Sequence, residues 1–406
     1  MNLKNEPRVI KTNLVKKIYA DGMTAEYDVY EIPLDLLFYN EFNDRVITYI
    51  SNYSKEELQK MRLENKEKYN DLFEEVITNT NIPAMKKTKN NIDIVGQLEV
   101  GVVLKDGRII DGNRRYTALR QLSKEGRAKR GFQAIILDFD YETNFKLIKQ
   151  LELEIQIGKD EKLPYKAIDV LISIYELVCE REFSISEVAK WTGLSEKQIN
   201  ENIENAKLIN ELLFFINAKK QYHIARENDW LFPIVEINSL LKKAQSLNIS
   251  NQELTMLKYS LFASLVVTSN GDKTRIFRNS YKKIIQTPEM ICSFIQKSDD
   301  IVKKINEKAN IHSDETNTLD VKEFFKSIIL DNELNDKVTH VRNAMIEKFE
   351  ILNSSNKMIE NIEQVQRKIE NLDSEMFRVL SVDEQQKMKS LITNVIEKLF
   401  DLKEKI

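Results

Sequence analysis

The sequence contains few of the residues that build cross-linked or turn-rich proteins. Among its 406 residues are 2 cysteines, 3 histidines, 10 glycines and 6 prolines. Cys179 and Cys292 lie far apart, without a CxxC pair or a neighbouring histidine, so a disulfide framework and a zinc finger are excluded. Scarce glycine and proline argue against a β-sandwich or β-barrel, because those folds need a turn every few residues.

Long apolar runs are also missing. No stretch approaches the ~18 residues of a membrane span, and no apolar signal segment follows the first residues, Met1 to Glu6. We therefore expect a cytoplasmic protein without membrane contact.

Charges of both signs are abundant and nearly balanced. The chain has 61 Lys and Arg against 64 Asp and Glu, a formal net charge of -3, with 42% hydrophobic and 31% charged residues. This composition supports packed cores in a largely helical protein. The length predicts about two to four domains.

The first part of the chain mixes strand and helix patterns. Residues 27–32 alternate with a period near two and stop at a proline, which predicts a strand. Residues 54–77, which begin with the capping pair Ser54 and Glu57, predict an exposed helix, and the polar stretch 78–91 predicts a loop. Later patterns predict two strands joined by a hairpin turn, then a helix and another strand, at 100–104, 109–110, 116–126 and 133–139.

From about residue 163 the patterns become entirely helical. Residues 168–178 predict one helix, residues 183–206 two short ones, and residues 208–330 longer ones. Apolar residues spaced 4, 3, 4, 3, 4 and 3 apart then form a heptad seam: Met358, Ile362, Val365, Ile369, Leu372, Met376 and Val379. With a further helix from Glu384, this seam predicts either an antiparallel hairpin or a dimerising coiled coil.

The most specific stretch is the strand–turn–strand–helix block at residues 101–120. Its centre, Asp111-Gly112-Asn113-Arg114-Arg115, leads from the second strand into the helix. Gly112 permits a tight turn and close approach of a ligand, and the N–H groups that open a helix favour an anion. Arg114 and Arg115 add forked donors that suit phosphate oxygens. The block predicts a phosphate site; a tight turn with two solvated arginines is the alternative.

This block resembles the phosphate-binding motif of the ParB/sulfiredoxin superfamily. ParB proteins carry Gly-Glu-Arg-Arg before a helix that begins with an aromatic residue and has a later alanine. Gly112, Asn113, Arg114 and Arg115, followed by Tyr116 and Ala118, stand in those places.

Two flanking features resemble the same family in the same order. Upstream, residues 32–37 leading to Arg45 resemble the ParB box that begins with an Ile-Pro-like strand and ends in an arginine. Downstream, residues 153–157 before Pro164 resemble the Glu-Asn-x-x-Arg segment, with Gln156 and Lys159 as substitutes for its polar end. The resemblance spans roughly residues 27–215.

The departures from the family motif concern chemistry. Asn113 replaces a glutamate that the family associates with nucleotide hydrolysis, so the resemblance implies phosphate binding more than turnover. Sulfiredoxin places its reactive cysteine at this position, so sulfiredoxin activity is excluded. The block also resembles the Asp-Gly-Gln-His-Arg motif of proteins linked to DNA modification and phage defence.

Residues 185–199 fit a helix-turn-helix, with Ala189 packed between the helices, Gly193 in the turn and Ile199 burying the second helix. The second helix offers four polar side chains to base edges: Lys197, Gln198, Asn200 and Asn202. Three glutamates on this helix would face the phosphates, so a helical pair that only packs or binds protein is the alternative.

Further charged residues suggest ligands. Nine basic residues between Lys105 and Arg130 face three acidic ones, which predicts a positive patch for phosphate. Glu152 and Glu154, two apart on a predicted extended segment, are the candidate Mg²⁺ ligands near the nucleotide. A second basic group is interpreted as a solvated loop, with a phosphate contact as the alternative: Lys273, Arg275 and Arg278.

Together these patterns predict an α+β N-terminal ParB/sulfiredoxin-like domain followed by helical regions. The domain occupies residues 1–150 with a helical insertion near 52–92. An all-α helix-turn-helix region follows at 151–215, a helical domain at 216–345, and a coiled-coil-like hairpin at 346–406.

The resemblance implies a DNA-associated homodimer that binds a nucleoside triphosphate, CTP by family analogy, with Mg²⁺. The implied binding residues are Gly112, Asn113, Arg114, Arg115, Arg45 and Glu154. Two alternatives stay open: a nuclease or nucleotide-hydrolysing effector on the same fold, and a scaffold that binds protein through its helical C-terminal half.

Overall fold

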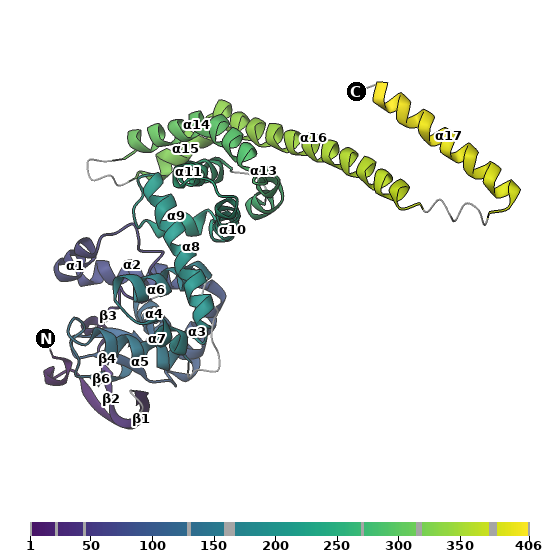
Figure 1. Ribbon diagram of the computed structural model, residues 1–406. Coiled ribbons are helices and arrows are strands. Elements are labelled where there is room, and N and C mark those ends of the chain that lie inside the picture. The colour runs from purple at the N-terminus through teal and green to yellow at the C-terminus, as the bar shows by residue number, and fades with distance from the viewer. Residues whose placement is uncertain are drawn as a thin grey trace. The chain divides into compact units, whose positions relative to one another are not determined.

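The computed structural model describes residues 2–20, 23–43, 46–127, 131–157, 167–268, 272–313, 319–372 and 380–404. The chain divides into two units, Met1–Arg342 and Asn343–Ile406. The first unit contains a β-sheet with helices and then a series of helices, and the second is helical (Figure 1). This arrangement confirms the predicted order of an α+β region followed by an all-α region.

The sheet has six strands in the order β1-β2-β6-β4-β5-β3. Its strands are β1 (Ile10–Ala20), β2 (Met23–Ile32), β3 (Phe38–Tyr39), β4 (Gly101–Leu104), β5 (Arg108–Asp111) and β6 (Phe132–Leu137). β3 pairs parallel with β5 and β4 parallel with β6, whereas the other neighbours are antiparallel. The carboxyl ends of β3 and β5 therefore lie at the same edge of the sheet.

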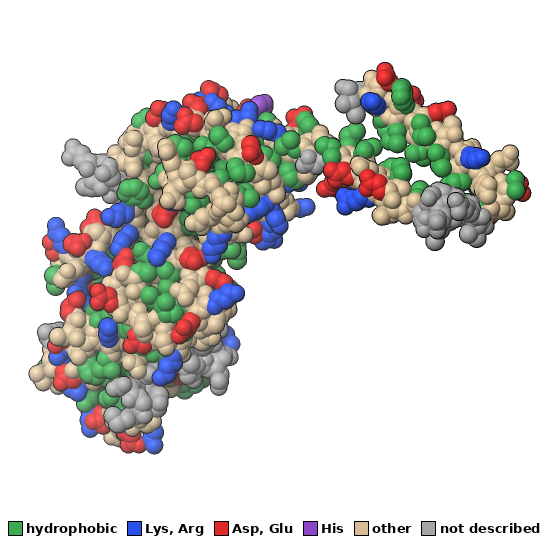
Figure 2. Space-filling model, viewed as in Figure 1, with side chains coloured by type: hydrophobic (Ala, Val, Ile, Leu, Met, Phe, Trp, Pro, Cys, Tyr) green, Lys and Arg blue, Asp and Glu red, His purple; other side chains and the backbone are tan. Residues whose placement is uncertain are grey.

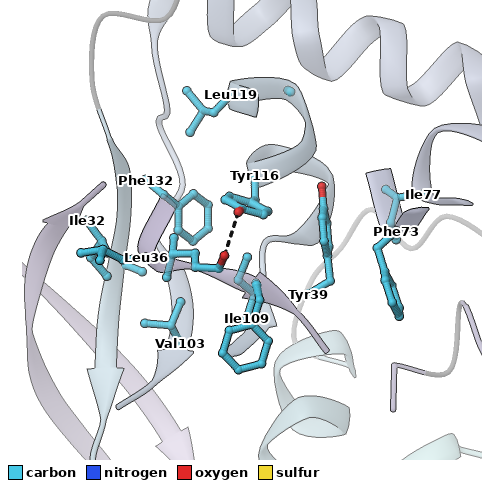
Figure 3. Close-up of a cluster of buried hydrophobic side chains, with 14 of the residues drawn as sticks. Ile32, Leu36, Tyr39, Phe73, Ile77, Val103, Ile109, Tyr116, Leu119 and Phe132 are labelled. Atoms are coloured by element: carbon cyan, nitrogen blue, oxygen red, sulfur yellow. Dashed lines mark hydrogen bonds between the residues drawn. The ribbon is translucent and has the colours of Figure 1, made fainter. Parts of the chain in front are cut away.

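The two faces of the sheet carry separate cores, because successive side chains of a strand point to opposite faces. Val103 and Ile109 belong to the core under α2 (Lys66–Thr80), α3 (Ile82–Val95) and α4 (Asn113–Lys124). Figure 3 shows this core, with Tyr116 beside Phe132 and Tyr39 beside Phe73. Val102 and Ile110 pack on the other face against α5 (Phe145–Ile157).

The predicted loop at 78–91 is wrong, because most of this stretch lies in α3. Asn81 begins the helix by accepting the backbone N–H of Ala84. Met85 and Ile92 are buried seven residues apart, but the intervening lysines and asparagines hide their helical period in the sequence. The exposed helix predicted at 54–77 is two helices, α1 (Lys55–Glu64) and α2, and Ser54 with Glu57 forms the predicted capping box.

Helices fill the rest of the first unit. A π-helical turn, η3 (Glu176–Glu180), extends α6, and another, η4 (Phe277–Tyr281), joins α12 to α13. The remaining helices are α6 (Ala167–Tyr175), α7 (Ile185–Thr192), α8 (Glu196–Phe215), α9 (Tyr222–Glu227), α10 (Leu231–Ser246), α11 (Asn251–Val267), α12 (Lys273–Ile276), α13 (Lys282–Ile284), α14 (Pro288–Ile311) and α15 (Val321–Ile329).

A polar joint connects the segment 46–53 to two of these helices. Thr48 donates its hydroxyl to Asp169 on α6. Ser51 Oγ lies 3.1 Å from His223 Nδ1 and accepts the His223 backbone N–H at 2.8 Å, and Arg226 of α9 stacks on the Tyr49 ring. Burial lowers the pKa of His223 and nearby Arg226 lowers it further, while Glu227 opposes them.

The C-terminal helices are α16 (Asn332–Glu370), which begins in the first unit and continues into the second, and α17 (Val382–Glu404). Met345 is buried, and no described residue after it is. The predicted helices are present, but Met358, Ile362 and Val365 of the heptad seam are 67%, 49% and 38% exposed. Met376 and Val379 of that seam lie outside the described residues.

A buried guanidinium joins α4 to α2. The side chain of Arg120 is 5% exposed, and its Nε donates to Glu74 at 2.8 Å. Its Nη2 donates to Glu67 and to Asp71, each at 2.8 Å. Because Glu74 is itself only 11% exposed, it needs this cation to compensate its burial.

Replacing Arg120 by alanine is expected to lower the free energy of unfolding by about 3 kcal/mol, since it leaves the largely buried Glu74 with the longer contact to the half-exposed Lys124. Lys124→Ala is the matched control on the same helix, because Lys124 binds Asp71 and Glu74 from a position that is 48% exposed. Lys124→Ala is expected to lower the free energy of unfolding by less than about 1 kcal/mol. Urea unfolding followed by circular dichroism measures the free energy of unfolding of both variants. Equal losses would contradict the larger role assigned to Arg120.

Candidate functional site

The predicted phosphate block folds as a hairpin that leads into a helix. β4 and β5 pair antiparallel around the turn at Gly107, and β5 ends at Asp111. Gly112 is the N-cap of α4, with a φ of 104°, and no side chain caps the helix there. A Cβ on Gly112 would lie 2.8 Å from Phe132 Cζ, so both the backbone and the packing require glycine.

The first turn of α4 presents Asn113, Arg114 and Arg115, all partly exposed. Asn113 Oδ1 is buried and has no hydrogen-bond partner among the described residues. An uncapped helix start of this kind favours an anion through its N–H groups and its dipole.

Arg115 is held within the protein. Its Nη2 donates to Asp111 at 2.9 Å, and its Nη1 donates to the Glu99 carboxylate at 2.9 Å and the Glu99 carbonyl at 3.1 Å. The Arg115 side chain is only 14% exposed. It therefore braces the turn at Gly112 against the start of β4, rather than standing as one of two solvated arginines.

The loop after β3 lies at the same sheet edge as Gly112. Thr117 donates its hydroxyl to the Asn113 carbonyl at 2.9 Å and therefore accepts from the Tyr39 hydroxyl at 2.7 Å, which links β3 to the first turn of α4. Asn40 is 1% exposed, and its Nδ2 has no partner among the described residues. Our sequence reasoning missed Tyr39 and Asn40; a signal for them was the polar run that follows a short apolar strand.

Arg45, which the resemblance placed at this site, lies outside the described residues, but Asn43 precedes it closely. Asn43 is buried and donates to Glu152 Oε1 at 3.1 Å. Lys149 lies 3.4 Å from Glu152 Oε2 and 3.5 Å from the Phe42 carbonyl. Glu152 is thus tied by hydrogen bonds to the chain segment that leads to Arg45.

The predicted extended segment around Glu152 is wrong, because it belongs to the helix α5. Two positions apart on a helix correspond to about 200° of rotation, so positions 152 and 154 lie on opposite sides of α5. The side chains of Glu154 and Gln156, and all of Lys159, lie outside the described residues. Among the residues that the structure describes, no three His, Cys, Asp or Glu side chains form a group able to hold a metal.

The expected positive patch between Lys105 and Arg130 is largely neutralised by carboxylates from other segments. Arg108 is buried against Glu41 and lies over the Tyr141 ring at 4.4 Å. Lys105 binds Asp140 at 2.9 Å and Asp138 at 3.3 Å, and these two hydrogen bonds raise its pKa. Four more cations of this stretch also form ion pairs with carboxylates from other segments: Arg115, Arg120, Lys124 and Arg127. Lys129 and Arg130 lie outside the described residues.

Helices α7 and α8 are joined by a short turn in which Gly193 has a φ of 72°. Capping boxes begin both helices, at Ser184 with Glu187 and at Ser195 with Gln198. Buried residues of both helices share one core: Val188, Trp191, Ile199 and Ile203, with Ala189 packed against it. Two helices joined by a turn are therefore present, but α8 extends to Phe215 and is longer than the short helix predicted.

The four polar residues predicted to read bases lie on the outer side of α8, where three are exposed and Asn202 is partly exposed. Gln198 accepts the Ser195 backbone N–H at 2.9 Å, and Asn200 and Asn202 donate to backbone carbonyls one turn earlier. Lys197 is 86% exposed and lies 4.0 Å from Glu201. Lys197 is thus the only one of the four with a cation directed to solvent.

No protein-family model matches this chain, and no curated protein matches it. Over the described residues, no helix is both long and apolar enough to span a membrane. Cys179 and Cys292 are both free thiols.

Gly112→Ala is expected to lower the free energy of unfolding by about 3 kcal/mol, from the left-handed conformation and the overlap with Phe132 together. Gly126 supplies the control, since its φ is 71° and nothing lies within 4 Å of a Cβ built there. Gly126→Ala therefore isolates the backbone cost of about 1 kcal/mol. Thermal unfolding of both variants measures the difference, and equal effects would show that the close approach to Phe132 is unimportant.

Proposed function

We propose that this protein binds the phosphates of a nucleoside triphosphate at the start of α4 and associates with DNA, in the manner of ParB-type proteins. One observation carries the proposal: α4 begins uncapped, directly behind a position that requires glycine. Helix starts of this form bind phosphate in many nucleotide sites. The order of the motifs along the chain, described above, supports the choice of CTP as the first ligand to test.

The roles within the proposed site differ from one arginine to the next. Arg114, on the first turn, would contact phosphate, whereas Arg115 would keep the turn in place through Asp111 and Glu99. Arg45 and Glu154 are proposed on the resemblance alone. Mg²⁺ would arrive with the triphosphate as its counter-ion.

The proposed DNA contact is the outer side of α8. Lys197 would meet a phosphate, and Asn200 and Asn202 keep their carbonyl oxygens for base edges while their amide nitrogens bind the helix backbone. Asn113 in the place of the family glutamate favours a binding switch over an enzyme. A nuclease, a nucleotide-hydrolysing effector and a protein scaffold are the outcomes that the experiments below separate from this proposal.

Calorimetric titration of the full-length protein with CTP, ATP and GTP in the presence of Mg²⁺ tests the nucleotide proposal. Arg114→Ala is expected to weaken the binding of one nucleotide at least ten-fold, because a charge-assisted phosphate contact contributes about 1.5–3 kcal/mol. Lys124→Ala, at the other end of the same helix, is expected to bind like the wild type.

Absence of binding to all three nucleotides would refute the nucleotide proposal, as would equal losses in the two variants. Release of inorganic phosphate in the same samples would identify an enzyme instead of a switch.

We also propose that the second unit dimerises the protein. No described residue of α16 or α17 after Met345 is buried. Apolar residues of both helices are exposed at helical spacing: Ile362, Val365, Ile369, Leu391, Val395 and Ile396. Light scattering of the full-length protein at micromolar concentration is expected to give twice the chain mass.

The variant Ile362→Asn/Ile369→Asn is expected to shift this mass toward that of one chain, since it removes two seam positions. Glu360→Asn/Arg367→Asn changes two positions of the same helix outside the seam and is expected to remain dimeric. A wild-type mass equal to that of one chain would refute the dimer proposal, and the heptad seam would then pack within the chain.

A further inference from the structure

A second cationic surface lies on the helical run 273–284, formed by α12, the π-helical turn η4 and α13. Phe277 and Tyr281 are fully buried, and their rings stack with centroids 4.6 Å apart. These anchors direct the opposite side of the run to solvent. Three exposed cations occupy that side, spaced three and four residues apart: Arg275, Arg278 and Lys282.

The neighbouring helix α10 adds two more cations. Arg278 Nε donates to Glu236 of α10 at 2.7 Å, which fixes the two helices side by side. Further along α10, partial burial and the nearby charge of Lys282 lower the pKa of Lys243. Lys242, directly before Lys243, is exposed and binds Glu204 of α8. We call Lys242, Lys243, Arg275, Arg278 and Lys282 the basic face.

The basic face carries more positive charge than its surroundings compensate. Its acidic neighbours Glu236 and Glu204 bind Arg278 and Lys242, and Asp272 adds a third negative charge near Arg278. In the described part of the chain, no carboxylate lies within 4 Å of the side-chain nitrogens of Lys243, Arg275 or Lys282. Figure 2 shows Lys and Arg side chains gathered where Figure 1 labels α10 and α13. An anionic partner would relieve the repulsion between Lys243 and Lys282.

We propose that the basic face binds the phosphate backbone of double-stranded nucleic acid. Arg275 and Lys282 are seven residues apart, or about 10 Å along a helix. A duplex strand presents a phosphate every ~3.4 Å of its axis, so the three cations of this run meet about three phosphates.

This inference extends the proposed DNA association to a second surface and rests on it, but it requires neither a nucleotide nor the α7–α8 pair. Lys273, Arg275 and Arg278 were predicted to lie in a solvated loop, but they lie in α12 and η4. Of the three, Arg275 and Arg278 belong to the basic face. Lys273 is half-buried, and its Nζ donates to the Asn228 carbonyl at 3.2 Å, so it supports the fold and stays outside the basic face.

The test uses full-length protein and a fluorescent duplex of mixed sequence, with binding measured by anisotropy at several salt concentrations without nucleotide. The variant Lys243→Gln/Arg275→Gln/Lys282→Gln removes the three cations that lack a carboxylate neighbour. Lys219→Gln/Lys297→Gln/Lys322→Gln is the matched control, because it removes the same charge from exposed positions elsewhere. Circular dichroism confirms that both variants fold.

We expect the basic-face variant to bind at least ten-fold more weakly at 0.1 M salt, with a slope of log K against log salt smaller by about 2–3. Equal binding by the two triple variants would overturn the inference, as would a wild type that does not bind the duplex. Tighter binding of the wild type to anionic lipid vesicles than to DNA would overturn it as well.

A separate variant, Lys197→Gln/Asn200→Ala, distinguishes this inference from the proposed function. Loss of binding in the basic-face variant alone would support the second surface and refute the contact through α8. Loss of binding in the α8 variant alone would support the contact through α8 and refute the second surface. The calorimetric nucleotide titrations are independent of both results.

Discussion

The left-handed turn at Gly112 is the constraint on which the N-terminal fold depends. It turns the chain from β5 into α4 within one residue and lets Phe132 of β6 approach the backbone. Because α4 begins there, Tyr116 becomes fully buried and donates its hydroxyl to the Leu34 and Leu37 carbonyls. The same turn leaves the first N–H groups of α4 without a side-chain cap. Packing and the proposed phosphate site are thus two results of a single backbone conformation.

Positive charge is distributed in a way that composition does not reveal. The cations around the Gly112 block mostly bind carboxylates of the same chain, and Arg108 and Arg120 are buried in doing so. Ion pairs of this kind join α4 to α2 and β5 to the segment after β3, and they leave little net charge for a polyanion. The basic face on α10 and the run 273–284 differs, since hydrophobic anchors hold it in place and, among the described residues, three of its five cations have no carboxylate within 4 Å. A protein with a net charge of -3 can therefore still present a local cationic surface.

Local patterns predicted the elements that depend on local interactions. The β4–β5 hairpin, the start of α4, the capping box of α1 and the turn at Gly193 follow from short-range sequence signals. The helix α5 did not, because Leu151 to Ile157 alternate like a strand, whereas the sheet face selects Ile148, Leu151 and Ile155 at helical spacing. The neutralised patch was also unpredictable, since Arg108 and Arg120 find their partners Glu41 and Glu67 across 67 and 53 residues of sequence. Partners at such separations are set by the tertiary fold.

The polar joint between Ser51 and His223 has a consequence for behaviour in acid. Because the pKa of His223 is lowered in the folded protein, the unfolded chain takes up a proton more readily than the native state does. As the pH falls below the ordinary histidine value of about 6.5, the native state must either keep a neutral ring or give up this burial. The polar joint between the segment 46–53 and α9 is therefore sensitive to acid. The stabilisation that this contact contributes therefore decreases as the pH falls through the histidine range.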